Sequence, residues 1–336
     1  MKPNQLKTQQ GLSLIELMIA VVLGIFITGG MLQLFVNGNQ SYRVQENLSR
    51  VQENGRFAMA FITRDLRVAG YYGCLNDATK IESNLNAGSS YDNYAIAIAG
   101  TNDDGPNDSD SISTSGMAQS GIFVVDIPAS TSADLKVTDN SGLAEDDVVM
   151  VLDCTAGDLF QITNNPSVGG AAGKDEVVHN TGAVGSGPGN FEKEFQKIYG
   201  TDAQIYKARS VRYFIAINPS NQPALYQSVN GALAQELVEG IETMQILYGV
   251  DTSGPDINGL RTANYYMPAT TPATVASLAL MEDVVSIRVS LLSTTLEDNL
   301  ATTNATTTVA TYTSPDDRKV RRTFTSTIAV RNRIPQ

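Results

Sequence analysis

The sequence predicts an α+β protein in which one long N-terminal helix precedes a β-rich head. Three features support this prediction. The run from Leu12 to Val36 is apolar except for one glutamate, an amphipathic stretch follows it, and beyond residue 74 short apolar runs alternate with segments rich in Asn, Ser, Thr, Gly and Asp. With 336 residues, the chain is long enough for one large domain or two modest ones.

The apolar run is long enough to cross a membrane. As a helix at 1.5 Å per residue it would span roughly 37 Å, against a bilayer core of about 30 Å. An ordinary secretory signal fits poorly, because the run is too long and no small-residue cleavage site follows it. A plain anchor leaves Glu16 unexplained, since a carboxylate deep in hydrocarbon costs about 2.5 kcal/mol or more without a partner.

The helix is predicted to continue as an amphipathic segment over residues 37–70. NGNQ at 37–40 is a weak point, and GYYG at 70–73 is predicted to end the helix, with Gly70 just past its last turn. One face carries a mostly apolar stripe that Asp65 interrupts: Val44, Leu48, Val51, Gly55, Ala58, Ile62, Asp65 and Ala69. We expect this face to pack on the head, with the arginines and glutamates opposite it in water.

The head, residues 71–336, is predicted to be an antiparallel sheet with long loops. The expected strands are 121–127, 147–154, 210–218, 224–229, 243–250, 284–292 and 321–332. Residues 233–242 have helical spacing. The polar segments 101–111 and 167–190 are predicted to be mobile or solvent-facing loops.

The composition favours neither an enzyme nor a nucleic-acid-binding protein. The formal charge is −12, and so acidic a surface repels phosphate backbones, so that no direct nucleic acid binding is expected. The one histidine, His179, lies in a polar Gly-rich stretch without an identifiable nucleophile or orienting acid, so we predict no catalytic residue and no cofactor.

Two acidic segments could supply oxygen ligands for Ca²⁺, although neither has EF-hand spacing: Asp103, Asp104, Asp108 and Asp110 in one, Asp251, Asp256 and Asn258 in the other. We interpret both as solvated turns and predict no metal site. The two cysteines, Cys74 and Cys154, would form one disulfide in an oxidising compartment and two free thiols in the cytosol.

The N-terminus resembles a known signal. Gly11 followed by LSLIELMIAVVLGI, behind a short basic leader, is similar to the class III signal of type IV prepilins and type II secretion pseudopilins. The resemblance implies that residues 1–11 are a leader, that a prepilin peptidase cuts between Gly11 and Leu12, and that Leu12 is then N-methylated. It also implies that Glu16, the fifth mature residue, pairs with a neighbouring subunit's N-terminal ammonium and sets the register between subunits. Leu12 departs from the usual Phe.

Two further segments narrow the resemblance. GRFAMAFITRDLRVAGYYGC and the C-terminal segment ending in RNRIPQ look like PilW-type minor pilins, which are similar to the J-type pseudopilins. This implies a type IV pilin-like fold with a transmembrane or filament-core helix over 12–36. It also implies a disulfide between Cys74 and Cys154, because VLDC at 151–154 matches the cysteine that partners the one after the helix.

The function implied is a minor pilin that takes part in starting pilus assembly, in a minor-pilin complex at or near the tip. The implied partners are other minor pilins, the major pilin, the prepilin peptidase, the pilus assembly platform and, before assembly, the inner membrane. The chain would cross that membrane once with its head in the periplasm, and would be extracellular after assembly. The alternatives are a J-type pseudopilin of a type II secretion system and an adhesin or binding module exported with the pilus.

Overall fold

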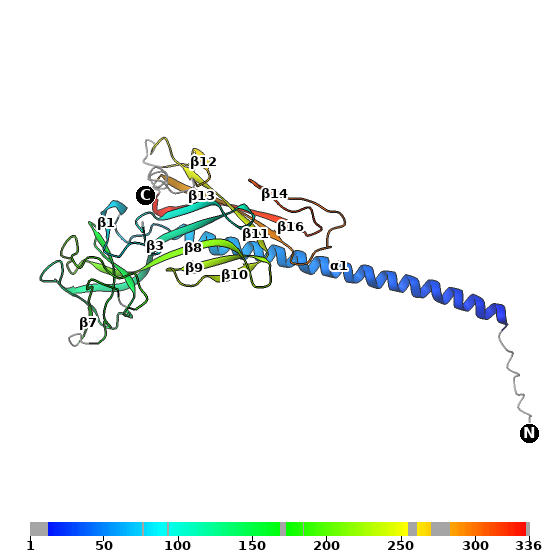
Figure 1. Cartoon of the computed structure of the whole chain (residues 1–336), viewed down its shortest axis with the longest axis horizontal. Coiled ribbons are helices and arrows are strands. Elements are labelled where there is room, and N and C mark those ends of the chain that lie inside the picture. The colour runs from blue at the N-terminus through cyan, green and yellow to red at the C-terminus, as the bar shows by residue number, and fades with distance from the viewer. Residues whose placement is uncertain are drawn as a thin grey trace, which may run out of the picture.

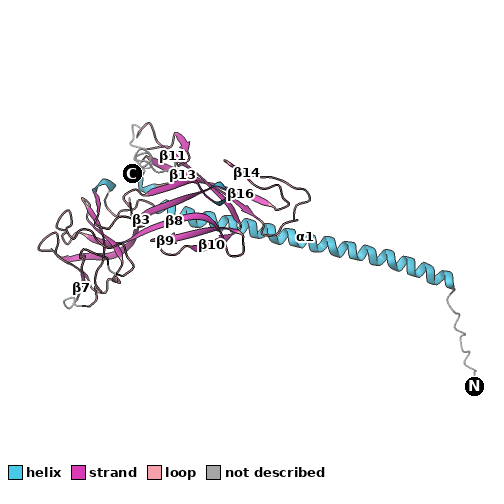
Figure 2. Cartoon of the chain, viewed as in Figure 1, coloured by secondary structure: helices cyan, strands magenta, loops and turns pink. Residues whose placement is uncertain are grey.

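The computed structural model describes residues 13–333 except 76, 93, 169–172, 184, 255–260 and 270–282. One helix projects from a β-rich head as a rod (Figure 1), and the head is built almost entirely of strands (Figure 2). This arrangement confirms the predicted α+β class.

The helix α1 runs without interruption over Leu14–Val68, through the NGNQ segment that the sequence marks as weak. Ala69 caps its C-terminus, and Gly70 follows with a φ of 73°. Glycine adopts this left-handed conformation without steric cost, and the Gly70 N–H donates to the Ser115 carbonyl at 2.8 Å. The helix therefore ends where the sequence predicts, on a bond to the head.

The described strands form two main sheets and one small ribbon. The larger sheet has 10 strands and is mostly antiparallel, but β1 and β6 pair in parallel. Its members are β1 (Ile81–Ser83), β2 (Ile98–Gly105), β3 (Ser109–Asp126), β4 (Leu135–Thr138), β5 (Val148–Leu152), β6 (Gly157–Gln161), β7 (Lys174–Val177), β8 (Gln204–Ile217), β9 (Pro223–Val229) and β10 (Gln235–Glu239).

The second sheet has 4 strands in the order β12-β11-β13-β16. These are β11 (Ile241–Val250), β12 (Tyr265–Met267), β13 (Val284–Thr294) and β16 (Arg321–Ala329). A short ribbon of β14 (Thr308–Val309) and β15 (Tyr312–Thr313) lies in the connection before β16, and three short 3-10 helices cover Ala78–Lys80, Pro106–Asp108 and Arg331–Arg333.

The second half of α1 packs into the main core of the head. Val51, Gly55, Ala58 and Ile62 are buried, as the predicted stripe requires, and Ala58 and Ile62 belong to that core. Gly55 permits close packing, because a Cβ at this position would lie 2.1 Å from the ring of Phe324 on β16. The helix and the strand thus approach more closely than any larger residue would allow.

Asp65 does not break this buried face, as the sequence suggested, but belongs to it. Its carboxylate accepts hydrogen bonds from the Tyr213 hydroxyl at 2.8 Å and from Arg209 at 3.1 Å. Arg64 also contacts it at 3.2 Å. A buried carboxylate is stable only with such partners, so hydrogen bonds to Asp65 hold the helix on β8 in addition to apolar packing.

Seven predicted strands are present, in β3, β5, β8, β9, β11, β13 and β16. Other predictions are wrong. Residues 233–242 contain β10 instead of a helix, with a bulge between Glu236 and Val238. The helical spacing of Leu233, Leu237 and Ile241 does not belong to one element, because Leu233 is exposed before β10 and Ile241 begins β11. Residues 101–111 are mostly the β2–β3 hairpin, although Asp103, Asn107 and Asp108 take the positive φ of tight turns.

The part of the head farthest from the N-terminus has its own core, which we call the distal lobe (Figure 1). Ends of β3 and β8 meet β4, β5, β6 and β7 there around buried residues that include Phe160, Phe195 and Tyr199. Part of the predicted loop 167–190 belongs to this lobe, because β7 lies within it and pairs with β4. The loop prediction is therefore wrong over Lys174–Val177.

Candidate functional site

The first half of α1 is an apolar rod without contact to the head. Every described residue from Leu14 to Val36 is exposed, and the most apolar 18-residue window of the helix has a mean hydropathy of 2.3. Apolar surface of this extent is unfavourable in water. The segment fits membrane anchoring, and a helix of its length and composition can cross a bilayer.

Glu16 lies in the first turn of this rod, in a reciprocal cap that the sequence analysis missed. The Glu16 N–H donates to the Ser13 hydroxyl at 3.3 Å, and the Ser13 N–H donates to the Glu16 carboxylate at 3.3 Å. The signal was present as Ser-x-x-Glu ahead of an apolar run. Gly11 and Leu12, the predicted cleavage and methylation site, lie outside the described residues.

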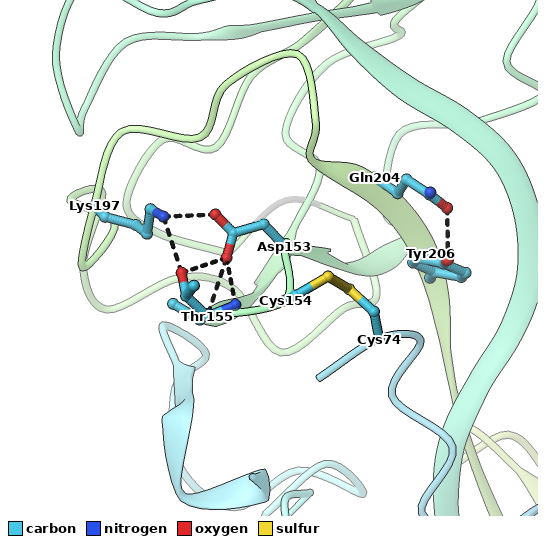
Figure 3. Close-up of a disulfide and its surroundings, with 8 residues drawn as sticks. Cys74, Asp153, Cys154, Thr155, Lys197, Gln204 and Tyr206 are labelled. Carbon is cyan, nitrogen blue, oxygen red and sulfur yellow. Dashed lines mark hydrogen bonds and ion pairs between the residues drawn. A yellow bond between two sulfur atoms is a disulfide. The ribbon is translucent and has the colours of Figure 1, made fainter. Parts of the chain in front are cut away.

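Cys74 and Cys154 are joined in a disulfide, with their Cα atoms 4.9 Å apart (Figure 3). Cys74 follows the helix by a few residues, and Cys154 lies in the turn between β5 and β6. The bond therefore ties the end of the helix to the sheet that leads into the distal lobe. Behind it, Tyr72, Met150 and Leu159 belong to a third buried cluster.

A charged side chain holds the turn that carries Cys154. One Asp153 oxygen accepts from the Thr155 N–H at 2.8 Å and its hydroxyl at 2.6 Å, and the other accepts from the Lys197 ammonium at 2.5 Å (Figure 3). Burial acts to raise the pKa of Asp153, but the bonds from Lys197 and Thr155 outweigh it and hold the pKa at about 2. The turn therefore keeps its charge at any ordinary pH.

His179 lies in the loop that follows β7, as predicted, but its side chain belongs to the core of the distal lobe. Its ring is fully buried, stacks on Phe195 at a centroid distance of 4.1 Å and meets the edge of Phe160. Burial lowers the pKa of His179, so that the neutral ring is favoured. Its Nε2 lies 3.1 Å from the Ala133 carbonyl, and its contacts with the two aromatic rings give it a packing role.

The acidic hairpin β2–β3 uses its carboxylates structurally. Asp110 is buried and accepts from the Ile246 N–H at 2.6 Å and the Asp103 N–H at 3.0 Å. Burial raises the pKa of Asp110 to about 6, despite these bonds. Within the described residues, no three His, Cys, Asp or Glu side chains lie close enough together to hold a metal ion. Asp256 and Asn258 fall outside those residues.

A comparison with protein families gives one match. The family model described as PilW, Type IV Pilus-assembly protein W, matches residues 212–332. This segment starts within β8 and runs to the last 3-10 helix, so it includes the whole sheet that packs on α1. Comparisons with curated proteins and with solved structures give no match.

Proposed function

We propose that this chain, which matches the PilW family model over residues 212–332, is a minor pilin that helps to start pilus assembly. In this role it acts in a complex with other minor pilins, at or near the pilus tip. The observation that carries the proposal is the combination of that family segment with a bare apolar helix bearing one carboxylate.

The proposal gives the two halves of α1 separate tasks. The exposed half, Leu14–Val36, lies in the inner membrane with the head in the periplasm, and after extraction from lipid it packs against helices of other subunits. The buried half fixes the head to that rod through Gly55 and Asp65. Because helix and head share one core, a force applied to either is transmitted to the other.

Glu16 is the proposed register group. After prepilin peptidase cleaves Gly11–Leu12, the new amino group of Leu12, which is then methylated, starts one helical turn before Glu16. The Ser13 cap holds the carboxylate at the helix N-terminus, where a neighbour's ammonium can reach it. At about 4 Å and an effective dielectric constant of about 20, such a pair attracts by roughly 4 kcal/mol, which favours one axial offset between helices.

The remaining partners follow from the same role. The major pilin would extend the filament from the minor-pilin complex, and the assembly platform of the inner membrane would deliver subunits to it. We propose no enzymatic activity, no cofactor and no direct nucleic-acid contact. Adhesion, motility or DNA uptake would belong to the complete pilus.

The test is to delete the chain in its native cells and count surface pili with retraction blocked. The proposal predicts a strong loss of pili, restored by the wild-type chain. Glu16→Ala should fail to restore them. The matched control Ser13→Ala removes the hydroxyl but keeps both the carboxylate and the backbone N–H that holds it, and should restore most pili. Normal pilus numbers in the deletion strain would contradict the assembly role.

A further inference from the structure

β16 presents the longest regular free edge among the described strands. It pairs with β13 along its whole length of 9 residues without a register shift. No described strand pairs with its other side. The other edges are shorter or interrupted: β1, β7, β10 and β12 have 3 to 5 residues, and β2 has a break in register after Thr101.

The register shows which backbone groups face this edge. Val330 donates to the Val285 carbonyl and Thr295 donates to the Val320 carbonyl, so the even-numbered residues of β16 hold the bonds to β13. In an antiparallel pair the alternate residues direct both their N–H and C=O groups the other way. The backbone groups of Thr323, Thr325 and Thr327 therefore face the free edge.

Nothing in the strand protects this edge. Natural proteins protect free edges with proline, bulges, inward-pointing charges or short strands. Between Thr323 and Ala329 there is no proline, no bulge and no charged side chain. Thr323, Thr325 and Thr327 are exposed, and the hydroxyls of Thr325 and Thr327 contact Ser290 and Arg288 on the neighbouring strand, on the face of the sheet and not across its edge.

Unpaired arginines lie beside the edge. Phe324 covers Gly55 and Asn332 bonds the Ala69 carbonyl at 3.0 Å, so β16 runs alongside this half of α1, as Figure 1 also shows. Four exposed arginines lie along the two elements and form no ion pair within the described part of the chain: Arg56 and Arg67 on the helix, Arg322 on β16 and Arg331 after it.

This basic surface is unusual in a chain with a formal charge of −12. Arg43, Arg50 and Arg64 of the same helix each have a carboxylate partner within 3.2 Å. The exposed acid nearest in sequence to Arg56 is Glu53, which forms no ion pair among the described residues. An acidic partner would therefore be attracted to the edge, whereas the β16 edge of a second copy carries the same arginines and would be repelled.

We propose that the β16 edge and these arginines are a docking surface on which an acidic β-strand of a neighbouring pilus subunit adds to the sheet. The added strand would bond to the outward backbone groups of Thr323, Thr325 and Thr327, and its carboxylates would face Arg56, Arg67, Arg322 or Arg331. This inference rests on the proposed function, because it requires the chain to assemble with other subunits.

The experiment places a photo-crosslinking residue at Thr327 of the full chain in its native cells. The expected product joins the chain to a different pilin-type subunit, with the linked peptide in a segment rich in Asp or Glu. Thr325→Pro removes one outward N–H and keeps the bonds to β13, while Thr325→Ala loses the same side chain but keeps the N–H. Arg322→Glu is matched by Lys80→Glu, at an exposed lysine of the 3-10 helix Ala78–Lys80 that has no ion pair among the described residues.

Thr325→Pro and Arg322→Glu should each lower the yield of the product by about fivefold, because a backbone hydrogen bond or a charge-assisted contact contributes roughly 1 kcal/mol. Thr325→Ala and Lys80→Glu should leave it within about twofold. A variant is compared only if both cysteines remain unreactive to an alkylating reagent without reductant, which shows that the Cys74–Cys154 disulfide has formed. Arg322→Glu leaves the strand backbone unchanged, so the test remains valid if Thr325→Pro does not fold.

Several results would overturn the inference. These are a product with a second copy alone, a product with lipid and no protein, or a product that neither Thr325→Pro nor Arg322→Glu reduces. Failure of the proposed function is seen separately, as normal piliation after deletion of the whole chain. If the deletion strain lacks pili while the Arg322→Glu strain retains both pili and the product, the edge inference fails and the assembly role remains.

Discussion

The helix-bound half of the head and the distal lobe are stabilised in different ways. Around α1, long strands such as β11, β13 and β16 lay alternating apolar residues on one helix face, and the core is a single large cluster. In the distal lobe, strands of four or five residues are held by buried polar side chains that bond to backbone and neighbours, such as Asp158 within β6 and Asp153 and Asn190 outside the strands. The first region is therefore stabilised mainly by apolar side chains that recur at regular spacing, and the second by particular polar contacts.

This difference decides what could be predicted. Seven strands and most of the buried face of the helix follow from periodicity, because burial on one face imposes period 2 or 3.6 on the sequence. The end of the helix follows from Gly70. The burial of His179 was missed because it depends on Phe160 and Phe195, which are distant in sequence. The β10 bulge and the paired strands of the acidic hairpin were missed for a similar reason, since the pairing that causes them is not local.

The same contrast applies to the candidate site. Glu16 and both cysteines could be selected from sequence, because a lone charge in an apolar run and two cysteines in the whole chain are conspicuous. The β16 edge could not be selected, since a free edge exists only once the partner strands are known. Asp65 was read as a break in the stripe, because Arg209 and Tyr213 lie far along the chain.

The largest effect should come from removing the link between the two regions. Cys74→Ser with Cys154→Ser opens a loop of 80 residues, and the loss of chain constraint should lower the free energy of unfolding by about 4 kcal/mol. Urea denaturation of the full chain in detergent measures it, with wild-type protein in reductant as control. Intact mass without reductant should show no free thiols in the wild type, and two free thiols in protein purified from the periplasmic side would contradict this account.

A smaller effect should follow in the helix-bound half from Asp65→Ala. The change leaves Arg209 and the buried Tyr213 hydroxyl without their shared acceptor, and should lower the free energy of unfolding by about 3 kcal/mol. Glu53→Ala, an exposed change on the same helix, should have an effect within about 0.5 kcal/mol. Equal effects of the two variants would mean that the Asp65 network does not hold the helix.

Gly55→Val tests the close approach of helix and strand. The added side chain would overlap the Phe324 ring, and displacing that ring should lower the free energy of unfolding by about 2 kcal/mol. Gly38→Val on the same helix is the matched control, because no atom lies within 4 Å of a Cβ built there. Since valine also has the higher helix propensity, the control should be neutral or slightly stabilising, by less than about 1 kcal/mol. A stabilised Gly55→Val variant would contradict the packing described.

The smallest effect at neutral pH, and the sharpest test of the distal lobe, concerns Asp158. Burial raises the pKa of Asp158 to about 6, although the Tyr199 hydroxyl donates to it. The folded chain therefore binds this proton more tightly than the unfolded chain between about pH 4 and 6, and the Asp158 contribution to stability is lost as pH rises.

Asp158→Asn should remove this dependence. The free energy of unfolding of the wild type, minus that of the variant, should fall as pH rises from about 4 to about 7. Urea denaturation at several pH values measures this difference. Asp110, whose stabilisation also falls as pH rises, and His179, whose stabilisation rises with pH, are present in both proteins, so their contributions cancel in the difference. A difference that stays constant or rises over this range would contradict the burial of a protonatable Asp158.

The central claim is that this chain becomes a polymerising subunit once its basic leader is removed. The N-terminal sequence of the protein isolated from its native cells tests that claim most directly. The account predicts a chain that starts at Leu12, with a methylated amino group, one turn from Glu16. A chain that still starts at Met1 in assembly-competent cells would contradict it.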